Sequence, residues 1–528
     1  MNECETDSEH DDALSFELCR PVEPHARQVM EWRNDPGTLA MSYHHARKTW
    51  DGFWPEFRDT YFSHAPEPLF VRRDGGRVGF LRFRPVPHPE GRAGPCVDIS
   101  INVAPEARGR GLGVEILRAA SDRLRRDGVD AIYAEVRAEN AASIRAFETA
   151  GYASLGPAEK LIEDTGERAA IVRFVHELVS PAWRRDRVLV IAEAGSNWRL
   201  GTPARDRAMA RALIDAAAEA GADAVKFQTY RPETVYVAGA GASSYLADAG
   251  IDDEIGDVFA DLAMPYEMLP ELADHCRAGG VAFMSTGFSV ADFEAIDPHV
   301  EIHKIASYEI SHPRLLEAAA RSGKPLVLST GASTESDIAW AVAHFHAHGG
   351  RDLCLLQCTA KYPAPLSTVN LRALPWLRRR FGVPVGLSDH SRDPITAPVG
   401  AVALGARVVE KHFTLHRALP GPDHSFALTP AELATMVRHV RAAEEALGAG
   451  DKVVQSAEQE LAAFARRGVQ ATRDVAPGDE LCEGVNVDIL RPGRQTLGVH
   501  PRHLPEIEAR RATRALGAGE GLRPGDWD

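Results

Sequence analysis

Eight short apolar segments, each followed by a stretch of helical character, recur along the middle of the chain. They lie at Val188–Ala192, Ala224–Phe227, Ala282–Ser285, Ile302–Ile305, Leu326–Ser329, Leu353–Gln357, Val383–Leu387 and Val408–Lys411. Strands that are apolar throughout are typical of parallel sheets, because both faces of such sheets are buried. Eight strand–helix units in succession predict a (β/α)₈ or TIM barrel, with an open doubly wound sheet as the competing arrangement.

Composition limits the class of protein. The chain has 528 residues, with 60 Lys and Arg against 75 Asp and Glu, which gives a net charge of −15. This acidity argues against nucleic acid or an anionic membrane as the main partner, because both attract basic surfaces. Seven cysteines, the lack of a CxxC pair and the lack of a leader or membrane-length apolar run predict a reduced, cytoplasmic protein.

The composition and the pattern of expected strands and helices change along the chain, and these changes predict three domains in an α/β protein. A disordered acidic tail over residues 1–13 precedes a mixed α+β domain at 14–180. The barrel is expected at 187–450. A linker at 451–465 then leads to a small, Gly- and Pro-rich, β-rich module at 466–528.

Polar residues gather where the eight strands end, which in a barrel is the edge that forms the active site. In chain order they are Glu193, Asn197, Lys226, Gln228, Thr229, Ser285, Thr286, Lys304, Ser307, Glu309, Ser329, Thr330, Gly331, Thr359, Tyr362, Ser388, Asp389, His390, Glu410 and His412. A single Ser or Thr there is often only the N-cap of the next helix. Lys226 and Lys304 lie inside apolar strands, and because a buried lysine needs a partner, they predict an anionic ligand.

Two histidines end neighbouring strands. His390 and His412 could coordinate a divalent metal at the same mouth as Glu193, Asp389 and Glu410. The alternative is that they are hydrogen-bonded histidines without a metal. A chelated cation could polarise an aldehyde oxygen while the lysines hold phosphate and carboxylate groups.

Nine strings occur in order along the barrel region: IAEAGSNW, AVKFQTY, STGFS, HKIASYEI, LSTG, CTAKYP, GLSDHS, VVEKHFTL and PGPDHSF. In order and spacing they resemble the sialic acid synthase family, which condenses phosphoenolpyruvate with an amino-sugar aldehyde. The resemblance implies that phosphoenolpyruvate is bound by Lys226, Thr286, Lys304, Ser307, Ser329 and Ser388. It departs from the family at Trp198, where a His is usual, and at Ala360, where some members have Asn.

The same resemblance implies the remaining roles in the barrel. His390 and His412 match the ligands of Mn²⁺ or Mg²⁺, and Glu193 matches the catalytic carboxylate beside the reacting sugar. The sugar contacts it implies are Asn197, Gln228, Tyr362, Asp423 and, from the C-terminal module, Arg491. In that family C3 of phosphoenolpyruvate attacks the open-chain aldehyde, water adds at C2, and phosphate leaves with C–O cleavage.

The C-terminal string RRGVQATRDVAPGDELCEGVNVDILRPG resembles the antifreeze-like (SAF) domain that follows sialic acid synthase barrels. That resemblance implies a domain-swapped homodimer, in which Arg491 approaches the acyl-amino group of the sugar in the partner's barrel. Ice binding is the alternative role for such a module.

A glycine-rich loop follows the strand Val97–Val103 in the first domain. It reads Arg108, Gly109, Arg110, Gly111, Leu112 and Gly113, and its glycines would let the backbone approach a pyrophosphate at a helix N-terminus. A lone loop of this kind is as often structural. Together with AIYAEVRAENAASIRAFETAGYA, however, it resembles the acyl-CoA N-acetyltransferase (GNAT) superfamily. That resemblance implies that the loop amides hold acetyl-CoA and that Asn140 lies beside its pantetheine arm.

Three further features of this domain bear on its activity. Phe147 stands where many members have a Tyr that protonates the leaving thiolate, and Glu135 is a candidate base. The string EWRNDP resembles the opening of acetyltransferases that modify nucleotide-linked 4-amino sugars. The alternative for that string is an amphipathic helix with a buried Trp32.

Both resemblances meet in nonulosonic acid synthesis. One hypothesis is a bifunctional enzyme that N-acetylates a UDP-4-amino-4,6-dideoxy sugar and condenses a 2,4-diacetamido-2,4,6-trideoxy hexose to pseudaminic acid. Phe426 and the KFQTY string favour pseudaminic acid, whereas PGPDH with His424 is similar to legionaminic and neuraminic acid synthases. The other hypothesis is that the GNAT domain is a non-catalytic docking or acyl-CoA-sensing module, or has another acceptor.

Overall fold

The computed structural model describes residues 14–43, 46–91, 95–162, 166–179, 183, 187–242, 253–448 and 452–528. The predicted disordered tail at 1–13 lies outside these residues. The chain forms two compact units, Met1–Leu447 and Gly448–Asp528. In the part of the chain that is described, no helix combines the length and apolar character needed to cross a membrane.

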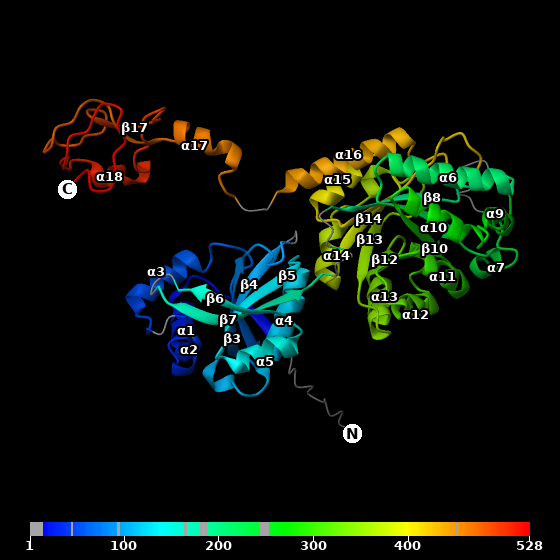
Figure 1. Ribbon diagram of the computed structural model, residues 1–528, viewed down its shortest axis with the longest axis horizontal. Helices are drawn as coiled ribbons and strands as arrows, with labels where there is room; N and C mark the ends of the chain where they lie inside the picture. Colours follow the sequence, from blue (N-terminus) through cyan, green and yellow to red (C-terminus); the bar gives the residue numbers. More distant parts are fainter. Residues whose placement is uncertain are drawn as a thin grey trace, which may run out of the picture. The chain divides into compact units, whose positions relative to one another are not determined.

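The first part of the chain folds around a mixed sheet with the strand order β1-β2-β3-β4-β5-β7-β6. The strands are β1 (Ser15–Leu18), β2 (Leu69–Arg73), β3 (Gly76–Pro85), β4 (Cys96–Val103), β5 (Ala131–Arg137), β6 (Ala153–Leu161) and β7 (Arg168–Glu177). The helices are α1 (Glu23–Arg33), α2 (Pro36–Met41), α3 (Trp50–Thr60), α4 (Leu112–Arg126) and α5 (Ala141–Ala150). Ile116, Leu117 and Leu124 on the apolar face of α4 belong to a buried cluster with residues of the sheet. Figure 1 shows α4 and the sheet. This is the predicted α+β domain.

The central strands β4 and β5 are parallel but pair over only three residues each. The partners are Cys96 with Ala131, Val97 with Ile132 and Asp98 with Tyr133. On its other side, β5 pairs with β7 over its whole length. The second halves of β4 and β5 are therefore not bonded to each other, and the sheet is open at the point where the glycine-rich loop follows β4.

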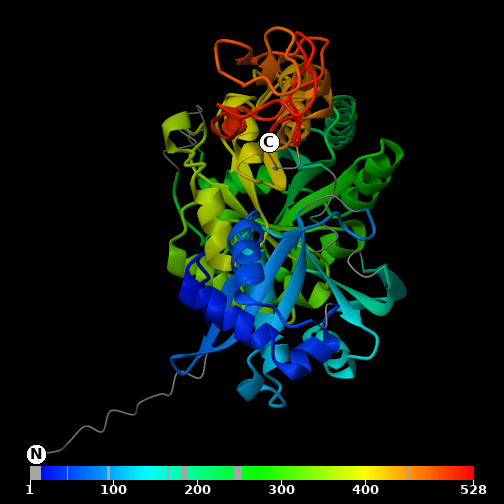
Figure 2. The ribbon, with the colours of Figure 1, turned by 90° about the vertical axis from the view of Figure 1, so that its left-hand side faces the viewer.

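The middle of the chain forms a closed barrel of eight parallel strands, which confirms the predicted (β/α)₈ fold and excludes the open sheet. The strands are β8 (Leu189–Gly195), β9 (Ala224–Thr229), β10 (Ala282–Gly287), β11 (His303–Ile305), β12 (Leu326–Ser329), β13 (Leu353–Cys358), β14 (Val385–Asp389) and β15 (Val408–His412). Each lies within three residues of its predicted position at either end. Figures 1 and 2 show the helices on the outside of these strands.

The outer helices follow the strands in the order expected for a barrel. They are α6 (Pro203–Glu219), α7 (Pro232–Val235), α9 (Ile255–Leu262), α10 (Met268–Ala278), α11 (Val290–Ile296), α12 (Pro313–Ser322), α13 (Glu335–Ala347), α14 (Ala373–Phe381), α15 (Thr396–Ala403) and α16 (Pro430–Leu447). Their apolar faces pack on the outward-facing side chains of the strands in two large clusters. The inward-facing side chains of the strands fill the barrel interior.

The barrel interior consists of an apolar layer and, next to it, a polar layer. The apolar layer is a buried cluster of Leu189, Ile191, Ala224, Met284, Ile302, Val327, Cys354, Leu356 and Val408. Because side chains alternate along a strand, residues two positions farther on point the same way. These residues form the polar layer: Glu193, Lys226, Thr286, Lys304, Ser329, Cys358, Ser388 and Glu410.

The segment before β8 also contributes to the interior. Val179 and Trp183 belong to the same apolar cluster, and Trp183 is only 3% exposed. Since they pack with the first residues of the strands, they form a plug at the amino-terminal end of the barrel. The polar layer lies toward the other end, so ligands have access from the carboxyl ends of the strands.

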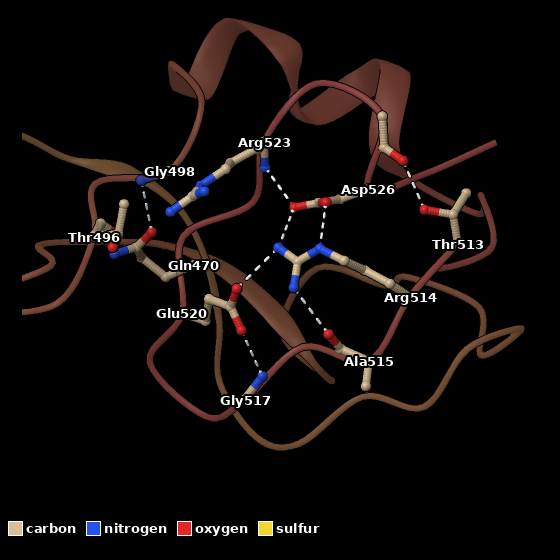
Figure 3. A network of polar contacts seen from close by, with 11 residues as sticks. Gln470, Thr496, Gly498, Thr513, Arg514, Ala515, Gly517, Glu520, Arg523 and Asp526 are labelled. Atoms are coloured by element: carbon tan, nitrogen blue, oxygen red, sulfur yellow. Dashed lines mark hydrogen bonds and ion pairs between the residues drawn. The ribbon is translucent and has the colours of Figure 1, made fainter.

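The C-terminal unit is a small module with little regular structure. It contains α17 (Gln459–Ala465), the antiparallel pair β16 (Gly468–Ala471) and β17 (Val487–Leu490), and α18 (Leu504–Ile507). Arg514 binds Asp526 through two nitrogens, at 2.7 and 2.9 Å, and lies 2.8 Å from Glu520 (Figure 3). A Cβ on Gly498 would lie 2.0 Å from the carbonyl oxygen of Val469, so only glycine fits there. Close backbone packing and part-buried polar contacts thus replace long strands.

Candidate functional site

The polar layer of the barrel centres on two buried lysines. The Nζ of Lys226 lies 2.5 Å from Glu193 Oε2 and 3.9 Å from Glu410 Oε2, and it donates to Thr286 Oγ1 at 3.0 Å. The Nζ of Lys304 donates to the carbonyl oxygen of Ile305 at 2.8 Å. Within the described ranges, no carboxylate lies within 4 Å of Lys304. The site therefore holds one lysine that is paired and one that has no acidic partner.

The ionisation of these groups follows from burial and from their charged neighbours. Burial alone would lower the pKa of Lys226, but Glu193 and Glu410 outweigh it and hold that pKa above its ordinary value. Burial lowers the pKa of Lys304, and Glu410 offsets this only in part. Burial raises the pKa of Glu193 to about 7 despite the nearby Lys226. An anionic ligand would supply the counter-charge that Lys304 lacks.

Hydroxyl groups surround the two lysines. Ser388 donates to Glu410 Oε1 at 3.0 Å, and Ser307 Oγ accepts from the backbone N–H of Gly331 at 2.9 Å. Ser329 Oγ is buried and has no hydrogen-bond partner among the described residues. Because a buried hydroxyl without a partner is unfavourable, Ser329 is suited to bind a ligand oxygen.

His390 and His412 lie side by side at the carboxyl ends of β14 and β15, with ring centroids 5.4 Å apart. The Nδ1 of His390 is 2.9 Å from the carbonyl oxygen of Thr359, which places a proton on Nδ1, so in the neutral ring Nε2 is the electron-pair donor. Burial and the neighbouring His390 keep the pKa of His412 well below its ordinary value, so His412 is neutral.

The histidine pair fits a divalent cation. The Nδ1 of His412 is buried without a hydrogen-bond partner among the described residues, and it lies 3.9 Å from Asp423 Oδ2. Neutral imidazoles with a nearby carboxylate are suitable ligands for a divalent metal. Aromatic rings line the same pair: Tyr362 lies 4.2 Å from His390, and Phe426 lies 5.2 Å from His412, between ring centroids.

The structure brings two more predicted residues, Gln228 and Asn197, to this mouth. Gln228 donates to Glu193 Oε1 at 3.1 Å, and Asn197 donates to the carbonyl oxygen of Phe413 at 2.9 Å. Gly195 has a φ of +53°, and a Cβ there would lie 2.9 Å from Asp423 Oδ2. This glycine therefore allows the carboxylates of Glu193 and Asp423 to approach the same point.

Arg491 lies in the other compact unit. It is exposed and directly follows β17. Its predicted contact with a sugar in the partner's barrel stays a prediction.

The prediction that Asp389 lies at the mouth beside the histidines is wrong. Its carboxylate binds the Nζ of Lys411, which also donates to the carbonyl oxygen of Ser391 at 2.6 Å. Asp389 and Lys411 are register partners, one position beyond the inward pair Ser388 and Glu410, so they point away from the interior. Sequence reasoning missed Lys411 as a buried ion-pair partner.

Two other polar groups also differ from the sequence-based picture. Thr229 and Ser285 bond to each other through their hydroxyls at 2.8 Å, and both have the outward register. Glu309 is among the polar residues predicted at the strand ends but was given no role there; burial raises its pKa to about 7 while Lys304 partly opposes this. Its Oε2 is buried and has no hydrogen-bond partner among the described residues. Its position five residues after Lys304 is the signal that could have linked it to that lysine.

The glycine-rich loop of the first domain joins β4 to α4. Gly109 and Gly111 have φ values of +78° and +77°, which glycine adopts readily. The guanidinium of Arg108 turns back, donating to Asp35 at 2.6 Å and to Thr38 at 2.7 Å. Its charge is therefore used to fix the loop to the segment after α1, and only the backbone of Arg108 remains for a pyrophosphate.

Other predicted residues of this domain have structural partners. Asn140 caps α5 by accepting from the N–H of Ser143 at 3.1 Å. Phe147 is buried and stacks on Phe174, with ring centroids 5.6 Å apart. Glu135 accepts from the hydroxyl of Tyr133 at 3.0 Å and pairs with Lys160. Leu112 and Gly113 begin α4, and Arg110 is exposed on the loop.

The string EWRNDP marks the end of α1 and the start of α2. Trp32 is buried in α1 and packs edge-to-face on Phe70, as the alternative of a helix with a buried Trp32 predicts. Asn34 bonds to Lys48 through both its amide nitrogen and its oxygen, at 2.9 and 2.7 Å. Asp35 caps α2 as well as binding Arg108. Through Asp35, this segment therefore helps to hold the glycine-rich loop in place.

Comparison with known proteins agrees with this division of the chain. The model of the NeuB family matches residues 213–452, that of the acetyltransferase (GNAT) family matches 27–152, and that of the SAF domain matches 466–526. The spore coat polysaccharide biosynthesis protein SpsE of Bacillus subtilis is 39% identical, over 65% of this chain and 93% of that protein.

Two enzymes of named specificity are also similar. The pseudaminic acid synthase of Campylobacter jejuni is 33% identical, over 65% of this chain and 97% of its own length. The N,N'-diacetyllegionaminic acid synthase of Legionella pneumophila is 35% identical, over 63% of this chain and 92% of its own length. These matches confirm the resemblance seen in the motifs. The chain belongs to the NeuB family and carries a GNAT domain before, and a SAF domain after, its NeuB barrel.

Proposed function

We propose that the barrel condenses phosphoenolpyruvate with a 2,4-diacetamido-2,4,6-trideoxy hexose to give pseudaminic acid and phosphate. We further propose that the GNAT domain N-acetylates a UDP-linked 4-amino-4,6-dideoxy sugar with acetyl-CoA. The observation that carries the first proposal is the polar layer, in which two buried lysines lie beside a neutral histidine and its neighbour His390. The similarity to a pseudaminic acid synthase supports the choice of sugar.

Phosphoenolpyruvate fits the charges of the layer. Its phosphate and carboxylate are the two anionic groups that Lys226 and Lys304 can neutralise. Ser329 has an unused hydroxyl, and Thr286, Ser307 and Ser388 add further polar contacts at the same level. The ligand would remove the unfavourable burial of an ammonium group at Lys304 that has no acidic partner.

His390 and His412 would hold Mn²⁺ or Mg²⁺, with Asp423 close to His412. When bound, such a cation polarises a carbonyl oxygen. The two rings, with Tyr362 packed on His390, orient the aldehyde end of the sugar against the phosphoenolpyruvate site.

Glu193 is placed for proton transfer. The reaction forms a bond between C3 of phosphoenolpyruvate and the aldehyde carbon, adds water at C2 and releases phosphate by C–O cleavage. The aldehyde oxygen gains a proton and the attacking water loses one, so one carboxylate can take up and return a proton within a turnover. The pKa of Glu193, about 7, suits a group that does both near neutral pH.

The aromatic wall of Phe426 and Tyr362 supports a deoxy, acetamido-bearing sugar, since both substituents expose methyl groups. Legionaminic acid synthesis is the second candidate, because a legionaminic acid synthase is 35% identical. His424, which belongs to the string shared with that branch, is buried with its Nδ1 2.6 Å from Thr414 Oγ1. Its Nε2 is buried without a hydrogen-bond partner among the described residues.

The proposal for the GNAT domain has a different basis. The open halves of β4 and β5 and the glycine-rich loop at Arg108–Gly113 provide the place for acetyl-CoA, with Asn140 at the start of α5. Phe147 has no proton to give, so it cannot act as the acid. Glu135 could serve as base only by exchanging its bonds to Lys160 and Tyr133.

The remaining assignments are proposals of the same kind. We place the domains at 14–180, 187–450 and 466–528, with 451–465 as the linker. We also propose a domain-swapped homodimer in which Arg491 reaches the partner's barrel.

The test uses the full chain with Mn²⁺, phosphoenolpyruvate and three hexoses in parallel. These are the altro-configured 2,4-diacetamido sugar, its legionaminate counterpart and N-acetylmannosamine. Phosphate release with the first sugar alone is the expected result, and preference for either of the others would replace the proposed substrate. In a separate assay, release of CoA from acetyl-CoA with the UDP-4-amino sugar is expected. No turnover there would refute the acetyltransferase proposal.

A further inference from the structure

Helices α12 and α13 lie next to each other on the outside of the barrel (Figure 1). Leu315 and Leu316 of α12 pack with Ala341 and Val342 of α13, so the relative position of the two helices is fixed by buried contacts. On the solvent side of this contact, Glu317 of α12 lies beside two histidines: His344 within α13, and His348 at the C-cap of that helix.

We propose that Glu317, His344 and His348 form a second metal site, for a divalent transition metal such as Zn²⁺. The ligand atoms of the three side chains all lie within 4.8 Å of one another. Glu317 Oε1 is 3.2 Å from His344 Nε2 and 3.9 Å from His348 Nε2. Tetrahedral zinc ligands, at about 2.0–2.1 Å from the metal, lie about 3.3 Å from each other. The observed spacing needs only small side-chain adjustments to hold the ion.

The hydrogen bond of His348 determines which nitrogen is offered. Its Nδ1 lies 2.9 Å from the carbonyl oxygen of His344, so Nδ1 carries a proton. In the neutral ring, Nε2 then presents a lone pair toward the carboxylate of Glu317. Two electron-rich atoms facing each other are unfavourable unless the ring takes up a proton or a metal ion lies between them. A backbone carbonyl that fixes the outer nitrogen is also the usual support of a metal-binding histidine.

The surroundings leave one carboxylate oxygen for the ion. Arg321 Nη1 lies 3.6 Å from Glu317 Oε2, the oxygen that does not face the histidines. The ring of Trp340 stacks on His344, with centroids 5.0 Å apart and planes 20° apart, which restricts the orientation of that ring. Both contacts pre-organise the ligands, although the positive charge of Arg321 weakens the attraction for a cation.

The donor set indicates the class of metal. Two imidazole nitrogens and one carboxylate oxygen suit Zn²⁺, Ni²⁺ or Cu²⁺, whereas Mg²⁺ prefers oxygen ligands. Three protein ligands leave a fourth position for water. Because His348 is 40% exposed, we expect an exchangeable ion rather than one trapped during folding.

The test compares metal-free full-length protein with three variants. Equilibrium dialysis against Zn²⁺, in the presence of saturating Mg²⁺, gives the number of ions bound per chain. His348→Ala and Glu317→Gln are each expected to bind one equivalent fewer than the unmodified chain, or to bind it at least tenfold more weakly. The matched control is His346→Ala, since His346 lies on the same helix but bonds to the carbonyl oxygen of Gly350 at 2.8 Å. It should bind the full number of equivalents.

A second readout locates the ion. Ni²⁺ is expected to quench the fluorescence of Trp340, so the quenching should be reduced in Trp340→Phe while the number of Ni²⁺ ions bound is unchanged. Phosphate release from phosphoenolpyruvate should be the same in all of these variants, because none lies in the barrel interior. Equal Zn²⁺ binding by the unmodified chain, His348→Ala and Glu317→Gln would overturn the proposal. The melting temperature of each variant shows whether it is folded.

Discussion

Glu193 Oε2 lies 2.5 Å from Lys226 Nζ, and the two residues are register partners on β8 and β9. Both are buried, so neither charge can be compensated by water. Replacing only Lys226 by Met leaves Glu193 without its partner, which typically costs about 3–5 kcal/mol of stability. We expect a clearly lower melting temperature and loss of phosphate release.

The double variant Glu193→Gln/Lys226→Met separates stability from activity. Because it buries no uncompensated charge from this pair, its melting temperature should recover most of the difference while phosphate release stays absent. A double variant as unstable as Lys226→Met would show that the two groups do not stabilise each other.

Substitutions of Asp389 and of His412 are expected to have opposite effects: the first should lower stability, and the second should abolish activity. Asp389→Asn removes the partner of the buried Lys411, so the melting temperature should fall by several degrees, while kcat for phosphate release, measured well below that temperature, changes little. His412→Ala should abolish phosphate release and leave the melting temperature nearly unchanged. A folded Asp389→Asn protein with weakened Mn²⁺ binding would instead place Asp389 at the metal.

Glu309 gives the protein a specific pH dependence. Its pKa in the folded state is about 7, above the ordinary value of 4.5, so its contribution to stability is fully present below pH 4.5 and is lost as the pH rises through 7. Glu309→Gln, which stays neutral, should match the unmodified chain near pH 5 and exceed its stability by about 1–3 kcal/mol near pH 8. Thermal melts across this range measure the difference. The exposed carboxylate of Glu267 provides a control, since Glu267→Gln should show no such trend.

Arg108 is expected to support CoA binding through Asp35. Arg108→Ala and Asp35→Asn remove the same ion pair, so each should weaken CoA binding by about tenfold, equivalent to about 1.4 kcal/mol, and the double variant should be no worse than either. Calorimetric titration with CoA measures this. Arg110→Ala tests direct attraction by an exposed arginine, and any effect of that variant should decrease with added salt. Additive losses in the double variant would indicate that Arg108 contacts CoA itself.

The barrel and most of its interior were predictable because one physical rule produces them. Apolar runs of strand length, separated by amphipathic helices, leave few ways to bury every strand on both faces. The polar residues at the strand ends were harder to sort, because a run such as Ser388, Asp389, His390 contains both inward and outward positions. Side chains alternate along one strand, so the inward Ser388, which is the register partner of Glu410, assigns Asp389 to the outside with Lys411.

Other contacts could not be predicted from local sequence. The bond between Arg108 and Asp35 joins positions 73 residues apart, and it depends on how α2 packs beside the glycine-rich loop. Asn140 illustrates a different limit, since the same residue type suits a helix cap and a ligand contact, and its capping bond to Ser143 leaves part of the amide for other partners. The opening between β4 and β5 follows from a register that no motif encodes.

Trp183 lies ahead of the first barrel strand in sequence, yet its side chain fills the barrel's amino-terminal end. A gene fragment that starts at residue 187 would encode all eight strands but would expose Leu189, Ile302 and Val408 to water at that end. Any separation of the GNAT domain and the barrel into independent polypeptides therefore has to cut before Val179. The connection between the two domains cannot be shortened or exchanged freely, because part of it is barrel core.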